Sequence, residues 1–350
     1  MLFGRFSGTH FEMGRQHGQA FASLLNQNRD AMHSVSPEVL RQQDLLFTKF
    51  ESALSRTAPE LIEEMRGIAE GSALSYEDVV RLNFAEEVGG GNLGCSQFGI
   101  VAADGSAVMG KNEDHGFGRR TYVVTELHPD NGYSQVHVGA VNWVVSSGSG
   151  INDAGLCVGQ SSLNVTSEAD GVPRLTMLRL VLERCATVSE AAELLRTKTG
   201  GIRGLNFLMV DANGDMAVVE SSPSLCAVRQ PEDCAIWAVN HPVDPKMRAV
   251  ERIIVGTETD LERTLALDAN TRQRFGRLSA LAREHADPLG HDEARRSVEN
   301  VIKSHGPGGM CQHGLMQTTW SVLMDARNRE LLLADGYPCM TAWERFSLAN

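Results

Sequence analysis

The most constraining feature of the sequence is a glycine-rich run that ends abruptly at a cysteine. Residues 89–94 read Gly-Gly-Gly-Asn-Leu-Gly, and Cys95 follows them. A strand-like segment then begins, Asp104-Gly105 provides a turn, and a second strand-like run leads to Asp114. We therefore predict a β-hairpin that brings Cys95, at its leading end, beside Asp114, at its trailing end.

This hairpin would suit a cysteine that becomes a new N-terminus when the chain is cut between Gly94 and Cys95. The thiol would attack the carbonyl carbon of Gly94, and hydrolysis of the thioester would leave Cys95 with a free α-amine. Glycine permits backbone angles at which the peptide bond to be cut is held out of its usual geometry. An α-amine has a pKa of about 7.7–8.0, so it could serve as general base for its own thiol. An inert, buried strand cysteine is the commoner explanation of a Gly-Cys pair taken alone.

Composition argues against several classes of protein. The chain has 350 residues and a formal net charge of −12, so nucleic acid or an anionic membrane is not expected as a partner. It has no apolar run of about 18 residues and no signal-peptide pattern, which predicts no membrane span. Seven scattered cysteines favour a reducing compartment, so we expect a cytoplasmic protein. Neither C-x-x-C nor H-E-x-x-H occurs, so we predict no metal site and no cofactor.

The hydrophobic patterns predict an α+β protein. The first 94 residues are mainly helical, with a helix that Thr9 caps and whose Gly14 and Gly18 permit close packing on a neighbour. Helices are also expected at 29–56, 58–71, from Ser75, at 174–198 with a cap at Ser189, and over most of 244–303. Strands are expected at 2–6, 122–127, 135–140, 142–146, 156–160, 205–210, 216–220, 225–229, 235–239, 320–325 and 330–334, with a loop at 148–155. Two antiparallel sheets between helical layers, a four-layer αββα sandwich, would bury these faces.

Short motifs spread along most of the chain resemble the acyl-coenzyme A:6-aminopenicillanic acid acyltransferase family, a cysteine branch of the N-terminal-nucleophile (Ntn) hydrolases. Each motif is weak, but their shared order is a strong signal. They occupy residues 8–18, 63–71, 82–83, 94–95, 110–114, 152–156, 207–210, 220–223 and 240–241. The resemblance implies the Ntn-hydrolase fold and self-cleavage at Gly94-Cys95, so the uncut chain would be a zymogen. After the cut, residues 1–94 would be a tightly bound small subunit, and residues 95–350 the large subunit.

The resemblance also implies roles for three residues. Cys95 would process the chain and then act as nucleophile. Asp114 would lie beside the new α-amine and orient it, although a solvated turn carboxylate is the commoner role for such a residue. Asn240 would donate its side-chain NH₂ to the oxyanion of the tetrahedral intermediate, although Asn-His-Pro is also good turn chemistry. Ser222, Glu220 and His241 match family positions and could support the site.

The predicted activity is hydrolysis of a linear, non-peptide amide, or transfer of its acyl group, with a small molecule as acyl donor. Two alternatives stay open. One is an unprocessed Cys–His hydrolase that uses His115, His241 or His313, and the other is a binding protein that kept the fold and lost activity. The chain could also form a homo-oligomer. Some family members carry an arginine in the segment that matches 312–318, and its absence here argues against a penicillin-like substrate. The final four residues match no peroxisomal address.

Overall fold

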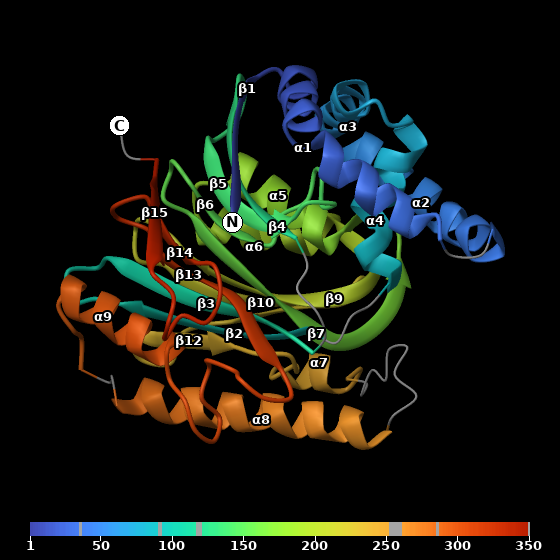
Figure 1. The fold of residues 1–350 in the computed structure, drawn as a ribbon. Helices are drawn as coiled ribbons and strands as arrows, with labels where there is room; N and C mark the ends of the chain where they lie inside the picture. The colour runs from blue at the N-terminus through green and yellow to red at the C-terminus, as the bar shows by residue number, and fades with distance from the viewer. Residues whose placement is uncertain (35–36, 90–92, 117–120, 252–260, 285–286, 349–350) are drawn as a thin grey trace.

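The computed structural model describes residues 1–34, 37–89, 93–116, 121–251, 261–284 and 287–348. Two β-sheets lie face to face between two layers of helices, as Figure 1 shows. The α+β, four-layer αββα sandwich expected from the sequence is therefore confirmed. Buried side chains from strands and helices fill the spaces between the layers.

The first sheet contains nine strands within the described residues. Along its main path they run in the order β1 (Leu2–Gly8), β4 (Tyr122–Pro129), β5 (Gln135–Ala140), β6 (Ser149–Asn152), β7 (Cys157–Ala169), β9 (Thr199–Val210), β10 (Met216–Ser221) and β11 (Cys226–Arg229), while β8 (Val172–Pro173) pairs with β9. The pairs β1–β4 and β8–β9 are parallel. The prediction of purely antiparallel sheets is wrong for these two pairs, because a long connection that contains helices separates the two strands of each pair along the chain.

The second sheet carries the predicted hairpin. Its six described strands are ordered β12 (Ala235–Ala238), β2 (Leu93–Val101), β3 (Ala107–His115), β13 (Gln317–Asp325), β14 (Glu330–Ala334) and β15 (Trp343–Ser347). All of these pairs are antiparallel. Strand β2 also packs against β7 of the first sheet, so the start of the hairpin lies between the two sheets.

Helices cover the outer face of each sheet (Figure 1). On the side of the first sheet lie α1 (His10–Met32), α2 (Pro37–Thr57), α3 (Pro59–Ser72), α4 (Tyr76–Gly89), α5 (Arg174–Arg184) and α6 (Val188–Lys198). The short helix α7 (Pro245–Arg248) contacts β11, while α8 (Leu261–Glu284) and α9 (His291–Ile302) pack on the second sheet. None of the helices in the described ranges is long and apolar enough to cross a membrane.

The close packing predicted for the first helix is confirmed. Thr9 caps α1 in a capping box with Glu12. A Cβ placed on Gly14 would lie 2.0 Å from a backbone oxygen of α3, and one on Gly18 would lie 2.4 Å from another. Larger side chains at these two positions would force α1 away from α3, which breaks contacts in the N-terminal helical layer.

Three local predictions are wrong. Residues 142–146 form turns instead of a strand, because Asn83 Oδ1 accepts hydrogen bonds from Val145 N and Ser146 Oγ and holds this segment against α4. The expected loop at 148–155 contains β6, whose small residues permit tight pairing with β5. Helix α6 is capped by Thr187 instead of Ser189.

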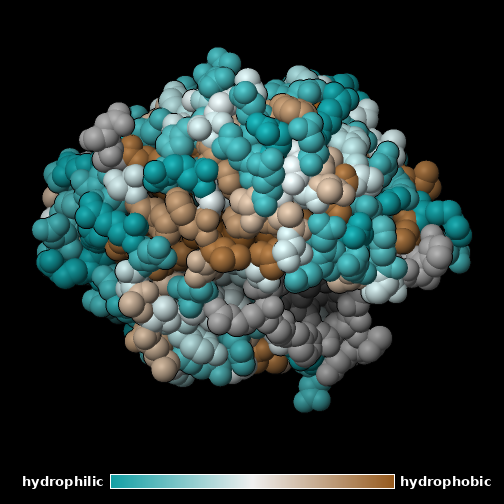
Figure 2. Space-filling view, turned by 45° about the horizontal axis from the view of Figure 1, so that its top comes forward, coloured by the Kyte–Doolittle hydropathy of each residue, from teal (hydrophilic) through white to brown (hydrophobic). Residues whose placement is uncertain are grey.

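The view in Figure 2 shows a largely hydrophilic face that a band of hydrophobic residues crosses. Hydrophobic surfaces of this kind are typical of contacts with another molecule. The homo-oligomer considered from the sequence stays a prediction.

Candidate active site

The β2–β3 hairpin confirms the predicted pairing of the two chain segments. Gly94 lies opposite Asp114, and Cys95 lies opposite Glu113. The hairpin therefore brings the carboxylate of Asp114 to the peptide bond before Cys95. Residues 90–92 of the glycine-rich run lie outside the described residues.

The Cys95 thiol is fully buried and faces a carboxylate. Its Sγ atom lies 3.4 Å from Glu113 Oε2, to which the thiol donates. Burial, followed by the negative charge of Glu113, raises the pKa of Cys95 well above its usual value. As long as Cys95 is an internal residue, its thiol therefore stays protonated at neutral pH.

Glu113 was missed in the sequence analysis, although it lies inside the Gly-Lys-Asn-Glu-Asp motif. Burial alone would raise its pKa, but the charge of Lys111 and the interaction with His115 outweigh burial and lower the pKa to about 2. Gln160 Nε2 also donates to Glu113 Oε2, at 3.3 Å. Glu113 is thus a buried, ionised group that several donors hold in place. The signal that could have found it is the strand alternation, which puts the residue opposite Cys95 on the same face as the thiol.

Asn240 lies directly beside the peptide bond that the proposed cleavage would break. It follows β12, and its Oδ1 accepts a hydrogen bond of 3.0 Å from Cys95 N. Its Nδ2 donates to the backbone oxygen of Ser162 at 3.0 Å. A primary amide carries two N–H donors, so Asn240 has a second one for an acceptor such as an oxyanion. The side chain therefore contacts Cys95, and a simple turn role does not describe it.

Arg274 is the second residue that the sequence analysis missed. This fully buried residue of α8 donates through Nη2 to Asn240 Oδ1 at 3.0 Å. Its Nη1 donates to the backbone oxygen of Cys95 and, at 2.8 Å, to Ser96 Oγ. One planar guanidinium thus ties the cysteine to the asparagine. No short motif marks Arg274, because it reaches the site from a helix far away in the sequence.

Asp114 is fully buried, so the alternative of a solvated turn carboxylate is wrong. Its Oδ1 accepts a hydrogen bond of 2.7 Å from Thr318 Oγ1, while its Oδ2 has no hydrogen-bond partner among the described residues. A Cβ on Gly94 would lie 3.3 Å from the Asp114 Cβ. Burial, opposed by Arg274 and Thr318, raises the pKa of Asp114 to about 6. Asp114 can therefore exchange a proton near neutral pH beside the Gly94-Cys95 bond.

None of the three residues predicted to support the site forms a hydrogen bond with the Cys95 thiol in the described part of the chain. Glu220 accepts from the backbone N–H groups of the loop after Asn240, at 2.9–3.1 Å. The Ser222 hydroxyl accepts from Leu225 N at 3.0 Å and closes a turn. His241 lies 3.4 Å from Thr271 Oγ1 through Nδ1, and burial lowers its pKa to about 4. Glu220 thus supports the Asn240 loop, whereas Ser222 has a local structural role.

No histidine of the described residues forms a hydrogen bond with the Cys95 thiol. His115 Nε2 contacts Glu113 Oε1 at 3.3 Å, and His313 contacts side chains of another cluster. The described hydrogen-bond partner of the Cys95 sulfur is Glu113. This arrangement does not favour the unprocessed Cys–His alternative.

The pH dependence of the free energy of unfolding tests whether Asp114 has a raised pKa in the folded protein. Its folded-state pKa, about 6, lies above the ordinary value of 3.8, so the folded chain binds this proton more tightly than the unfolded chain does. The free energy of unfolding therefore falls as the pH rises from about 4 to about 6. Asparagine cannot ionise, so Asp114→Asn should stabilise the protein by up to about 3 kcal/mol at neutral pH.

The measurement is thermal unfolding of Cys95→Ala and of Cys95→Ala/Asp114→Asn, because neither variant has the cysteine that the proposed cleavage requires. We expect a higher Tm for the double variant at neutral pH and a much smaller difference near pH 4. Equal differences at the two pH values would show that Asp114 does not titrate in this range.

The four-layer αββα sandwich, with a buried cysteine at the start of a central hairpin, is the Ntn-hydrolase class of fold. The family model described as "Acyl-coenzyme A:6-aminopenicillanic acid acyl-transferase" matches residues 101–304. This match covers more than half of the chain and includes Asp114 and Asn240, and it begins after Cys95. The chain belongs to this family of acyltransferases.

Individual relatives are more distant. The chain is 25% identical over 251 residues to the acyl-coenzyme A:6-aminopenicillanic-acid-acyltransferase 40 kDa form of Emericella nidulans. The aligned region covers 69% of this chain and 69% of that protein. Among solved structures, it is similar to a variant of the conjugated bile acid hydrolase from Clostridium perfringens, with 12% identity, a TM-score of 0.47, and coverage of 73% of this chain and 97% of that one. It is also similar to penicillin V acylase from Agrobacterium tumefaciens, with 19% identity, a TM-score of 0.46, and coverage of 73% and 86%.

Proposed function

We propose that this protein cleaves itself between Gly94 and Cys95 and then uses Cys95 to hydrolyse a linear small-molecule amide, or to transfer its acyl group. The observation that carries the proposal is the hydrogen bond between Cys95 N and Asn240 Oδ1, at 3.0 Å. The same bond would hold the α-amine that cleavage creates. Membership of an acyltransferase family supports the reaction class.

The cleavage step uses groups that surround the Gly94-Cys95 bond. The Cys95 sulfur would form a bond to the carbonyl carbon of Gly94 while the C–N bond breaks, and the thiol proton would end on the departing nitrogen. Asp114 can relay this proton, because its pKa of about 6 lets it accept and return a proton near neutral pH. Water would then hydrolyse the thioester, which leaves a carboxylate on Gly94 and a free thiol and amine on Cys95.

Turnover would use the same residues in a second arrangement. The α-amine of Cys95 would take the thiol proton, and the sulfur would attack the carbonyl carbon of the substrate amide. The second N–H of Asn240 would donate to the oxyanion, and Arg274 would keep the asparagine in place. The C–N bond of the substrate would then break, and the protonated α-amine of Cys95 would give its proton to the departing amine, which leaves the acyl group on Cys95 as a thioester. Water or an acceptor amine would attack this thioester, and the Cys95 thiol would be released.

Residues 1–94 would remain bound after cleavage as a small subunit. Strand β1 pairs in parallel with β4 over its whole length. Two buried ion pairs also join the segments: Glu64 with Arg179 at 3.3 Å, and Glu87 with Arg174 at 3.1 Å. Separation would expose a sheet edge and break these buried ion pairs, which is strongly unfavourable.

The test combines intact mass spectrometry with a panel of N-acyl amines and detection of the free amine. We expect two chains that begin at Met1 and Cys95, and release of amine by this processed protein. An intact chain that turns over the same amides would favour the Cys–His alternative. A processed or unprocessed protein that releases no amine, and whose Cys95 iodoacetamide does not label selectively, would favour the binding protein.

A further inference from the structure

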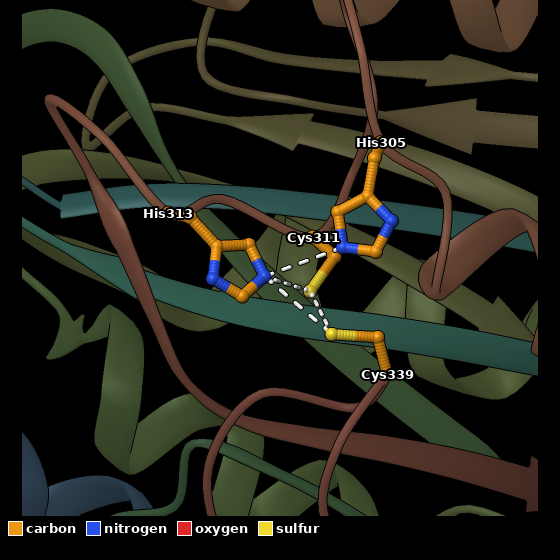
Figure 3. Close-up of side chains that lie close together, drawn as sticks. All are labelled: His305, Cys311, His313 and Cys339. Atoms are coloured by element: carbon orange, nitrogen blue, oxygen red, sulfur yellow. Dashed lines mark hydrogen bonds between the residues drawn. The ribbon is translucent and has the colours of Figure 1, made fainter.

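A cluster of four metal-binding side chains lies apart from the residues that contact Cys95. Its members are His305, Cys311, His313 and Cys339, shown in Figure 3. Each of these residues offers one ligand atom, and the four ligand atoms all lie within 4.8 Å of one another. The cluster joins the segment between α9 and β13 to the segment between β14 and β15.

Four of the six distances between ligand atoms in this cluster fit a tetrahedral zinc ion, and all six are within 4.8 Å. Zn–S bonds of about 2.3 Å and Zn–N bonds of about 2.0–2.1 Å place sulfur atoms about 3.8 Å apart, sulfur and nitrogen about 3.6 Å apart, and nitrogens about 3.3 Å apart. The two Sγ atoms are 3.6 Å apart, and Nε2 of His305 lies 3.3 Å from Nε2 of His313. His313 Nε2 lies 3.2 Å from Cys311 Sγ and 3.5 Å from Cys339 Sγ.

Hydrogen bonds alone do not account for this geometry. Nε2 of His313 faces His305 Nε2, Cys311 Sγ and Cys339 Sγ at the same time, as the dashed lines in Figure 3 show. A ring nitrogen has either one hydrogen or one lone pair, so it can serve only one linear partner well. A cation at the centre would accept a lone pair from all four groups together.

We propose that His305, Cys311, His313 and Cys339 bind a zinc ion. Two thiolates and two imidazoles in a tetrahedral arrangement are the donor set typical of zinc. Four protein ligands leave no open position, so the site is structural and not catalytic. No metal site was predicted from the sequence, because neither C-x-x-C nor H-E-x-x-H occurs in it, whereas this cluster combines a Cys-x-His pair with two more distant ligands.

The site would order a segment that reaches the active site. Cys311 N donates to Ser304 O at 3.0 Å, which closes the loop that carries His305. Thr318 then pairs with Gln312 through hydrogen bonds of 2.9 and 3.0 Å and donates to Asp114. The zinc ion would therefore hold residues 305–313 in place next to Thr318, the residue that donates a hydrogen bond to Asp114.

The primary test is the zinc content of the whole purified chain, measured by inductively coupled plasma mass spectrometry after dialysis against metal-free buffer. We expect about one zinc per chain in the wild type and in Cys95→Ala, so the result does not depend on self-cleavage. The double variant Cys311→Ser/Cys339→Ser should retain almost none. Cys226→Ser, which changes a partly buried cysteine outside the cluster, is the matched control and should retain the wild-type content.

Cobalt substitution keeps the proposal testable if the double variant does not fold. The wild type loaded with Co²⁺ should show the absorption of a tetrahedral cobalt–thiolate site, and His313→Gln, at an exposed position, should weaken it. A wild-type chain that binds neither zinc nor cobalt would overturn the proposal. A Cys311–Cys339 disulfide, seen as two missing thiols in a titration of the unfolded chain, would overturn it as well.

Discussion

Replacing Cys95 with alanine is expected to leave one uncleaved chain and to lower amide turnover by a factor on the order of 10⁵ or more. Alanine keeps the strand geometry at this fully buried position but removes the atom that would attack Gly94. The same atom is the proposed nucleophile for the substrate, so both reactions depend on it. A denaturing gel should show a single full-length band for Cys95→Ala and two bands for the wild type.

Cys157→Ala is the matched control for this experiment. Cys157 is also fully buried and lies in β7, which packs on β2, so its replacement tests for general effects of a lost buried thiol. The control should still be cleaved. Terminal sequencing of the larger wild-type fragment should begin Cys-Ser-Gln-Phe. Identical bands for Cys95→Ala and the wild type would rule out processing by this thiol.

The sequence was sufficient to predict the hairpin and the main layers, because both follow from local patterns. Alternation, turn residues and the Gly-Cys pair identify β2 and β3 without knowledge of the rest of the chain. Hairpin pairing then fixes Asp114 opposite Gly94 through a short connection. The helical first 94 residues were predictable for the same reason, since caps and apolar stripes are local signals.

The rest of the site depends on contacts between distant segments. Arg274 lies more than a hundred residues beyond the hairpin and enters the site only because α8 packs beneath β2 and β12. The pKa of Asp114 depends on burial between layers, which no motif encodes. The cluster around His313 needs Cys339, whose position follows from the pairing of β14 with β13 and of β15 with β14. Such residues require the tertiary structure, because their signal is distance and not spacing.

Asn240→Ala should lower kcat/KM for the processed enzyme by about 10²–10³-fold, chiefly through kcat. The asparagine has two proposed tasks, since its Oδ1 would hold the Cys95 amine and its second N–H would stabilise the oxyanion. Its removal also leaves Arg274 Nη2 without an acceptor that lies 3.0 Å away in the native protein. The measurement is the steady-state rate with an amide identified in the panel of N-acyl amines.

Ser222→Ala provides the contrast that separates catalysis from support of the fold. The Ser222 hydroxyl closes a turn with Leu225, whereas the Asn240 side chain contacts Cys95. Ser222→Ala should therefore change kcat/KM by less than about threefold, because the hydroxyl makes only this local turn contact. If Asn240→Ala were equally mild while Cys95 remained essential, the oxyanion would have to be bound by other donors. Backbone N–H groups near Cys95 would then be the groups to test.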